Sequence, residues 1–269
     1  MADSTAVAWP RPYFTPGPHR TQILFACFGK APLAELDIEL ARFGLPSREL
    51  AGQVDVREHR RAAKPQWFED WWGASFGVIA QQDLEHDLAL LTTSSTCFTL
   101  QLDLPDQADL SPLQTVWGLS RWLCARGADV VLDVHSLRYR TRRELEGLDF
   151  ERADVQRDVK LVLESDADER GLHLLHTRGL CKFARPELLG WIRQGDAAVL
   201  GAALNQIART LMEGAAPEQI RLRLTEGVEL VTQPSSERAL LESLALPAAV
   251  ELVRADGAPL ASVERLLGG

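Results

Sequence analysis

Apolar residues recur along the chain in short runs whose spacing changes between that of strands and that of helices. The run TQILFACFG at 21–29 indicates a buried strand that ends at a glycine. Alternating or continuous apolar runs of similar length predict the other strands. We expect these at 54–56, 84–92, 96–104, 128–141, 159–165, 171–177, 219–232 and 249–257, the segments 84–104 and 219–232 each forming a hairpin.

Apolar residues at intervals of three and four predict the helices between these strands. One helix is expected over 33–40, and a short one after Pro65. Ser111 and Pro112 are typical of a helix start, and Gly127 of its end. Further helices are expected over 186–214 and 261–267.

This order of elements predicts an α+β fold with mixed, largely antiparallel sheets and helices packed on one face. A chain of 269 residues suits one large domain or two α+β lobes sharing a core. We expect an extended proline-rich arm over 1–20, fixed by Trp9, Tyr13 or Phe14. An N-terminal lobe over 21–110 and a C-terminal lobe over 111–269 follow.

The charge balance is acidic, with 29 Lys and Arg against 38 Asp and Glu, a formal net charge of -9. This charge disfavours nucleic acid and anionic lipid and favours a basic protein or a cationic ligand as partner. Solubility alone is the alternative explanation. Because the chain has no apolar run of roughly 20 residues and no signal-like N-terminus, we expect a cytoplasmic protein without a membrane partner.

The cysteines give no sign of a metal site or a disulfide framework. Cys27, Cys97, Cys124 and Cys181 are widely spaced in apolar surroundings and form no CxxC pair. We expect buried free thiols. The phosphate-binding loops GxxxxGK[ST] and GxGxxG and the GxSxG nucleophile motif are also missing from the sequence. No metal and no cofactor are therefore expected.

One block offers a family resemblance. The segment 176–188 reads HTRGLCKFARPEL, which resembles a signature of bacterial domain-of-unknown-function families, approximately His-Thr-x-Gly-Leu/Met-x-x-Phe/Leu-Gly-x-Pro-Glu-Leu. The resemblance covers about 113–232 and implies a fold neighbourhood without a chemistry. It departs from the pattern at Ala184, where glycine is usual, so a turn with positive φ is not required by this sequence.

Two histidines and two carboxylates are the candidate catalytic residues. Asp133 and His135 are two apart on a predicted strand and so share a face, where His176 and Glu187 could join them around a metal or a water. Ordinary polar pairing is the alternative. Turn and helix-cap roles also explain the block that holds His176 and Glu187.

Two further patterns are candidate binding sites. Arg138, Arg140 and Arg142 are expected on one strand face, where they could bind an anion or protect a sheet edge. The aromatic cluster of Trp67, Trp71 and Trp72 could be an exposed partner-binding patch or part of the core.

These features lead to one expected function and two alternatives. We expect a non-enzymatic bacterial protein that binds another protein, of an immunity or accessory type, and masks a basic partner. The first alternative is a hydrolase that uses the His and carboxylate residues, with the arginines orienting an anionic substrate. The second is an anion-binding module that uses the arginines without turnover.

Overall fold

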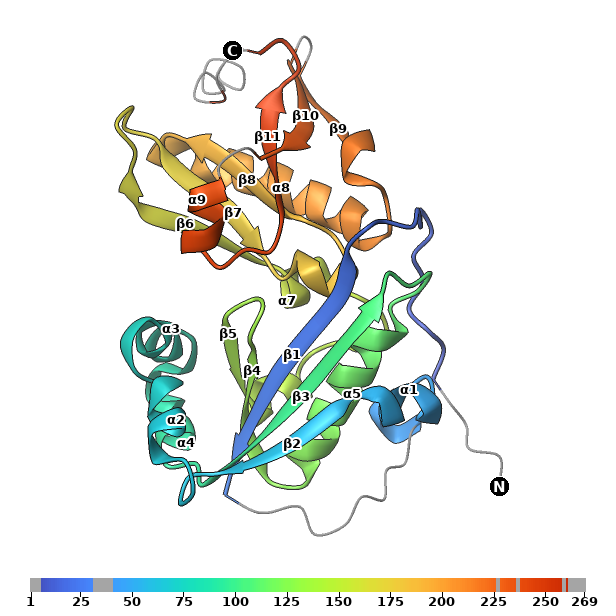
Figure 1. Ribbon diagram of the computed structural model, residues 1–269, viewed down its shortest axis with the longest axis vertical. Coiled ribbons are helices and arrows are strands. Elements are labelled where there is room, and N and C mark those ends of the chain that lie inside the picture. The colour runs from blue at the N-terminus through green and yellow to red at the C-terminus, as the bar shows by residue number, and fades with distance from the viewer. Residues whose placement is uncertain (1–5, 31–40, 226–227, 236–237, 258–259, 261–269) are drawn as a thin grey trace. The chain divides into compact units, whose positions relative to one another are not determined.

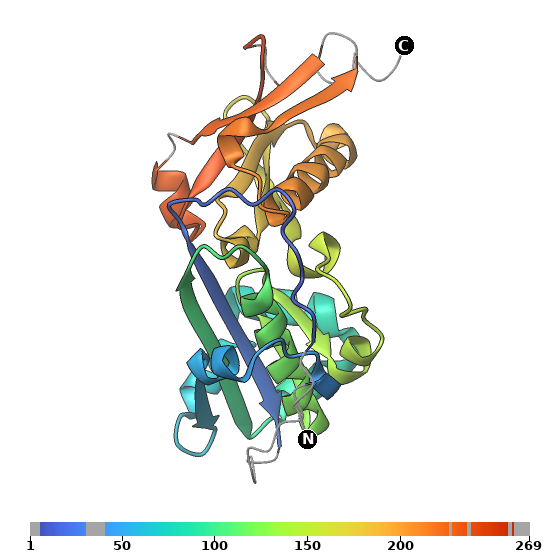
Figure 2. The same ribbon diagram turned by 90° about the vertical axis from the view of Figure 1, so that its right-hand side faces the viewer.

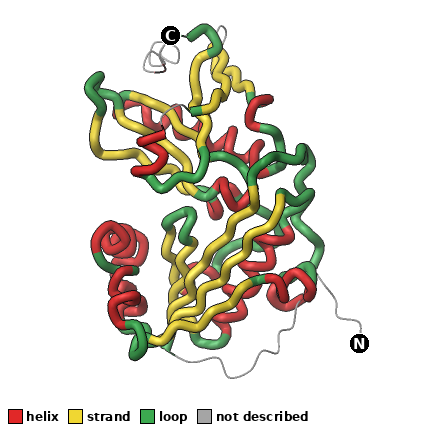
Figure 3. Tube along the Cα trace, in the orientation of Figure 1, coloured by secondary structure: helices red, strands yellow, loops and turns green. Residues whose placement is uncertain are grey.

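The computed structural model describes residues 6–30, 41–225, 228–235, 238–257 and 260 (Figure 1). The chain forms two compact units, and each contains both helices and strands (Figure 3). The first unit comprises Met1–Pro10, Gln22–Leu104 and Asp109–Ala153, and the second Arg11–Thr21, Pro105–Ala108 and Asp154–Gly269. The main division therefore falls near residue 153, whereas the sequence placed it at 110.

The first unit is built on a five-stranded sheet in the order β2-β3-β1-β4-β5. Strand β2 pairs antiparallel with β3 across the three helices that connect them, β4 and β5 form an antiparallel hairpin, and β4 also pairs antiparallel with β1. The strands are β1 (Arg20–Gly29), β2 (Asp55–Arg60), β3 (Thr96–Pro105), β4 (Ala128–Asp133) and β5 (Arg138–Thr141).

Helices cover both faces of this sheet, whereas the sequence predicted helices on one face only. On one face Trp117 of α5 (Ser111–Ala125) meets Phe25 of β1, with ring centroids 4.5 Å apart. On the other face α2 (Pro65–Asp70), α3 (Ala74–Leu84) and α4 (Leu88–Thr92) pack on a buried cluster around Phe28 and Tyr139. The smaller helices of this unit are α1 (Arg48–Gln53), α6 (Arg142–Glu146), and the 3-10 turns Ala41–Phe43 and Glu85–Asp87.

Two strand predictions in this unit are wrong. The segment predicted as a strand at 84–92 forms a 3-10 turn and α4, so no hairpin joins it to β3. A short apolar run has no period that distinguishes a strand from a buried helix. The predicted strand at 128–141 is interrupted by a turn at 134–137, where Leu137 has φ of +50°, and forms the hairpin of β4 and β5.

The second unit is built on a six-stranded mixed sheet in the order β6-β7-β8-β11-β10-β9. Its neighbouring strands are antiparallel except for β8 and β11, which are parallel. The strands are β6 (Lys160–Ala167), β7 (His173–Arg178), β8 (Glu187–Ile192), β9 (Arg221–Thr225), β10 (Val228–Pro234) and β11 (Ala249–Arg254). The α+β class with largely antiparallel sheets is thus confirmed.

Helices α8 (Ala197–Met212) and α9 (Arg238–Ser243) lie on opposite faces of this sheet (Figure 2). A Cβ atom at Gly190 of β8 would lie 2.7 Å from Leu200 of α8, so glycine allows this close approach. On the other face the segment around α9 packs on Leu174 and Leu189. The remaining elements are α7 (Val155–Asp158) and the 3-10 turns Leu180–Phe183, Gln194–Asp196 and Pro217–Gln219.

The prediction of a helix over 186–214 is therefore correct for α8 and wrong for 187–192, which is strand β8. Residues 188–192 are apolar apart from Gly190 and lie between two helices, and a strand buried on both faces loses the alternation that identifies it. The predicted helices at 33–40 and 261–267 lie outside the described residues.

The proline-rich arm is fixed by Trp9 in the first unit and by Arg11 in the second. Trp9 is buried, and its amide donates to Oε1 of Gln114 at 3.1 Å. The Tyr13 side chain, by contrast, is 60 % exposed, and it is the backbone amide of this residue that is engaged, donating to the Glu213 carbonyl at 3.0 Å. Arg11 shares the Asp106 carboxylate with Arg185, at 2.6 and 2.7 Å, and all three side chains are buried.

The block of the family resemblance forms a tight connection between β7 and β8. Gly179 (φ +111°) and Ala184 (φ +53°) both have left-handed backbone conformations and bracket the 3-10 turn Leu180–Phe183. The turn therefore does require a positive φ at Ala184, the position where the family pattern has glycine. Glu187 accepts hydrogen bonds from the amides of Gly179 and Leu180, both at 2.8 Å. It begins a strand and does not cap a helix.

Ala184→Gly should stabilise the protein by about 0.5–1 kcal/mol, because an alanine in the left-handed region is strained and a glycine is not. Urea unfolding of the variant and the wild type measures the difference. The matched control is Ala216→Gly at φ of -75°, which should destabilise instead. A loss of stability in Ala184→Gly would contradict the strain assigned to this turn.

Candidate protein-binding surface

The helical layer formed by α2, α3 and α4 is held on the first sheet by aromatic side chains. Phe68 is fully buried, and its ring centroid lies 6.4 Å from that of Phe28 in β1. Trp71 packs on the same Phe28 ring at 6.1 Å. The hydroxyl of Tyr139 donates to the backbone oxygen of Trp71 at 2.5 Å. The aromatic residues thus anchor the layer to the sheet.

The three predicted partner-binding tryptophans are partly buried, so each contributes both to packing and to the surface. Trp67, Trp71 and Trp72 pack against the buried cluster without belonging to it. Trp67 stacks on His59 with 4.3 Å between ring centroids, and Arg61 lies 5.1 Å above the Trp72 ring. Burial and neighbouring cations lower the pKa of His59, which favours the neutral ring at this contact.

The charges of this layer all have one sign. Residues 65–92 include five carboxylates and no lysine or arginine. Glu69, Asp70 and Glu85 are exposed. Asp83 instead closes the edge of β5, since its Oδ2 accepts the Tyr139 amide at 2.9 Å. We call Glu69, Asp70, Asp83, Glu85 and Asp87 with the helices that carry them the acidic layer.

An apolar residue is exposed on the same layer. Val78 of α3 is 60 % exposed, which places it among the large hydrophobic residues that remain accessible in the described chain. Isolated apolar residues are common on protein surfaces. The layer also carries partly exposed tryptophans and exposed carboxylates, and such a combination of apolar and charged residues is typical of protein interfaces.

Three arginines near the layer are engaged locally, whereas Lys64 directly before α2 is exposed. In β2, Arg57 pairs with Asp55 at 2.5 Å and Arg60 with Glu58 at 2.7 Å. Arg61, in the turn that follows, donates to the Thr92 carbonyl at 2.7 Å. In the layer itself, Glu85 lies 3.7 Å from His86, and Asp87 lies 3.9 Å from Arg143.

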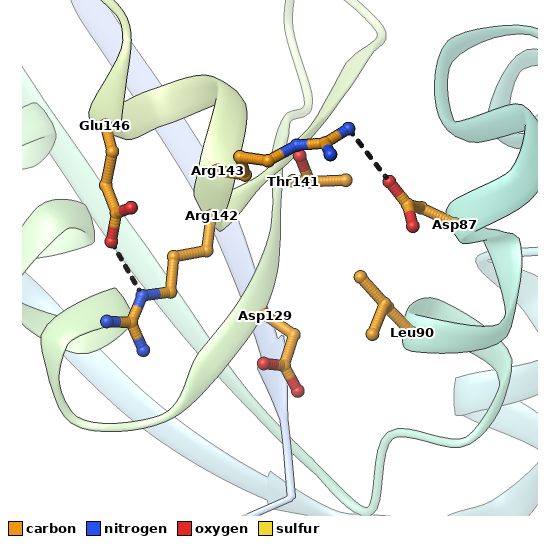
Figure 4. Close-up of a pocket in the computed structure, with 7 residues that line it drawn as sticks. All are labelled: Asp87, Leu90, Asp129, Thr141, Arg142, Arg143 and Glu146. Atoms are coloured by element: carbon orange, nitrogen blue, oxygen red, sulfur yellow. Dashed lines mark hydrogen bonds and ion pairs between the residues drawn. The ribbon is translucent and has the colours of Figure 1, made fainter.

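A pocket of about 370 Å³ lies where the acidic layer meets α6 (Figure 4). Arg142 pairs with Glu146 at 2.9 Å, and Arg143 reaches across the opening to Asp87. The Asp129 carboxylate lies between Arg142 and Leu90 in this view. The full lining is Asp87, Leu90, Asp129, Thr141, Arg142, Arg143 and Glu146.

Three carboxylates against two arginines leave this pocket with a formal excess of one negative charge. Its volume is at the lower end of the range for small-molecule sites, but such sites have mostly apolar walls. Here Leu90 is the single apolar residue of the lining. The pocket therefore extends the acidic character of the layer and does not resemble an enclosed substrate site.

The predicted catalytic residues divide between the two units. Asp133 is buried at the end of β4, where its Oδ1 accepts the Ser136 amide at 3.3 Å, and His135 lies in the following turn. The prediction that Asp133 and His135 share one face of a strand is therefore wrong. In the second unit His176 is buried, with Nε2 2.9 Å from Oε1 of Glu164 and Nδ1 3.1 Å from the Thr177 carbonyl oxygen.

Glu187 has its own set of partners. Its carboxylate accepts from the Thr177 hydroxyl at 2.7 Å in addition to the two turn amides. Burial raises the pKa of Glu187, and these hydrogen bonds partly oppose that effect. Among the described residues, no group of three or more His, Cys, Asp or Glu side chains is arranged to hold a metal.

The predicted arginine row is also not formed. Arg138 and Arg140 lie on β5, but Arg142 is the first residue of α6, so the three do not share a strand face. The capping box of Thr141 and Glu144 ends the strand and starts this helix. Arg140 is buried, with its guanidinium 5.6 Å from the Trp117 ring centroid. Only Arg142 of the row lines the pocket.

The four cysteines are free and buried, as predicted. Burial raises the pKa of Cys124 to about 12 and that of Cys27 well above its usual range. Such thiols stay protonated at neutral pH and are poor nucleophiles.

The residues not predicted from the sequence are Asp87, Asp129, Arg143 and Glu146 of the pocket and Asp83 and Glu85 of the acidic layer. The long interval without lysine or arginine at 65–92 could have indicated the layer. The pocket joins residues from three separate segments, and no sequence signal indicates such a meeting.

Comparisons with known proteins give no relative for this chain: no family model, no curated protein and no solved structure matches it. None of the described helices has the length and the hydropathy required to cross a membrane.

Proposed function

We propose that this protein acts by binding a basic protein through its acidic layer. The observation that carries the proposal is the charge of the layer, five carboxylates without a lysine or arginine over residues 65–92. A surface of one sign accelerates the encounter with a partner of the opposite sign and disfavours other partners.

The surroundings of the layer support a specific contact. Val78 and the partly exposed Trp71 and Trp72 supply apolar area on the same helices as the carboxylates or at their ends. Tryptophan is enriched among the residues that dominate binding energy at interfaces. The packing of these rings on Phe28 and Phe68 holds the surface in one arrangement before the partner arrives, which reduces the entropy cost of binding.

An immunity or accessory role follows from the same surface. A protein that covers a basic surface prevents that surface from reaching its own anionic target, and an acidic layer of fixed shape is suited to this task. We place the interaction in the cytoplasm, because four buried free thiols suit a reducing compartment.

The triple variant Glu69→Gln, Asp70→Asn, Glu85→Gln should lower the rate of association with the basic partner by about tenfold or more at low ionic strength. The partner is obtained by affinity capture from native cells on the immobilised full-length chain. Surface plasmon resonance then gives the association rates of wild type and variant over a series of salt concentrations.

The matched control is Glu151→Gln, Glu169→Gln, Glu218→Gln, which removes the same number of exposed carboxylates elsewhere on the chain. This control should capture the partner as the wild type does. The proposal fails if the two triple variants associate with the partner at the same rate, or if the wild type captures no stoichiometric basic protein.

A further inference from the structure

The edge strand β6 of the second sheet carries an exposed apolar centre. Among the described residues β6 pairs only with β7, so it forms one end of the strand order. Leu163 in its middle is 37 % exposed and is one of the large hydrophobic residues that remain accessible. Natural proteins usually protect such edges with charged residues along the strand. In β6 the charges flank the centre: Lys160 precedes Leu161, Val162 and Leu163, and Glu164 follows them.

This five-residue segment is complementary to itself. In an antiparallel pair of two copies related by a two-fold axis at Val162, each residue lies opposite the one at the same distance on the other side of the axis. Val162 then meets Val162 of the second copy, and Leu161 meets Leu163. Lys160 meets Glu164, and the symmetry repeats this pair, so that both charged residues of each copy have a partner of opposite sign.

The side chains are also on the correct faces for these pairs. Val162 pairs with His176 of β7, and Leu163 with Leu175, so alternate residues point to opposite faces of the sheet over 160–163, and the register shifts after Leu163. A Cβ atom built at Gly201 of α8 would lie 3.4 Å from the Leu161 side chain, so Leu161 faces α8. Leu163 is two residues further along the strand and shares this face. Lys160 and Val162 share the other face, and the contact of Glu164 with His176 places its carboxylate there too.

We propose that a second copy of this chain pairs with β6 in this antiparallel register and joins the two six-stranded sheets into one. Main-chain hydrogen bonds between the edges would supply affinity, and the side-chain pairs would set the register. The Glu164 side chain is 39 % exposed while its Oε1 holds His176, so its carboxylate is accessible to Lys160 of a second copy. This inference concerns the second unit and is independent of the acidic layer.

Sedimentation velocity of the full-length chain over a concentration series tests the proposal. We expect a reversible dimer. Lys160→Glu should raise its dissociation constant about tenfold or more, since two carboxylates then face each other at two symmetric positions. Lys64→Glu makes the same change of charge at an exposed site of the first unit and should leave the dimer unchanged.

A mixing experiment separates register from a general charge effect. Glu164→Lys should also weaken self-association, because two lysines then face each other. An equimolar mixture of Lys160→Glu and Glu164→Lys should form heterodimers, since every facing pair has opposite signs again. If Glu164→Lys does not fold, the comparison of Lys160→Glu with Lys64→Glu decides alone.

Two results would overturn the proposal. One is a wild-type chain that stays monomeric at every concentration, which is also the result expected if a strand of a different protein occupies this edge. The other is a dimer that Lys160→Glu and Lys64→Glu affect equally.

Discussion

Asp106→Asn should destabilise the second unit by about 3–5 kcal/mol, the usual cost of leaving buried charges without their counterion. Asp106 lies between Arg11 and Arg185, and the three side chains together carry one net positive charge in a buried place. An asparagine keeps the shape but leaves two buried guanidinium groups without a neutralising carboxylate.

The backbone acceptors around this triad cannot replace the carboxylate. Arg11 already donates to the carbonyls of Met212, Gln107 and Phe183, and Arg185 to others, including that of Gly214 at 2.8 Å. The triad therefore ties the arm to three other segments of the second unit, and we expect all of them to loosen together.

Hydrogen exchange of the full-length chain in increasing urea measures this loss for the second unit separately from the first. Asp166→Asn, at an exposed position of the same unit, is the matched control and should change stability by less than about 0.5 kcal/mol. If Asp106→Asn and Asp166→Asn were equally stable, Asp106 would not be the counterion on which Arg11 and Arg185 depend.

Glu187→Ala should cost about 3 kcal/mol or more, because it removes the acceptor of three buried donors at once. These donors are the Thr177 hydroxyl and the amides of Gly179 and Leu180. Each buried donor left without a partner costs about 1–3 kcal/mol, and the removal of a buried carboxylate offsets part of the total. Hydrogen exchange of β7 and β8 in increasing urea measures this change in the free energy of unfolding.

Glu187→Gln is the informative partner variant, since it retains an oxygen for the two amides and has no charge. The raised pKa of Glu187 means that the folded chain binds its proton more strongly than the unfolded chain does. The wild type should therefore lose stability relative to Glu187→Gln as pH rises from the unfolded carboxyl pKa through the folded one. A difference that is constant with pH would contradict the raised pKa.

The sequence correctly predicted the elements whose apolar residues follow the period of their own secondary structure. The strand at 21–29, the pair β6 and β7, the helix ended by Gly127 and the antiparallel β9 and β10 were all predicted correctly. It failed where tertiary burial overrides periodicity. The apolar run 88–92 becomes helix α4 because it covers a sheet, and 187–192 becomes strand β8 because it lies between two helices.

The candidate sites show the same limit. The spacing of two residues predicted a shared strand face for Asp133 and His135, but strand β4 ends at Asp133 and His135 lies in the four-residue turn that follows. The acidic layer could be predicted in outline, because its charge is a local property of one segment. Its pocket could not, since Asp129 and Glu146 reach it from different elements.

The central claim is that the acidic layer is the surface that a basic partner covers. Hydrogen exchange mass spectrometry of the full-length chain, with and without its captured partner, tests this most directly. The account predicts slower exchange in the partner complex over 65–92 and at the α6 side of the pocket, with the effect reduced at high salt. Unchanged exchange over 65–92, with protection confined to other segments, would contradict it.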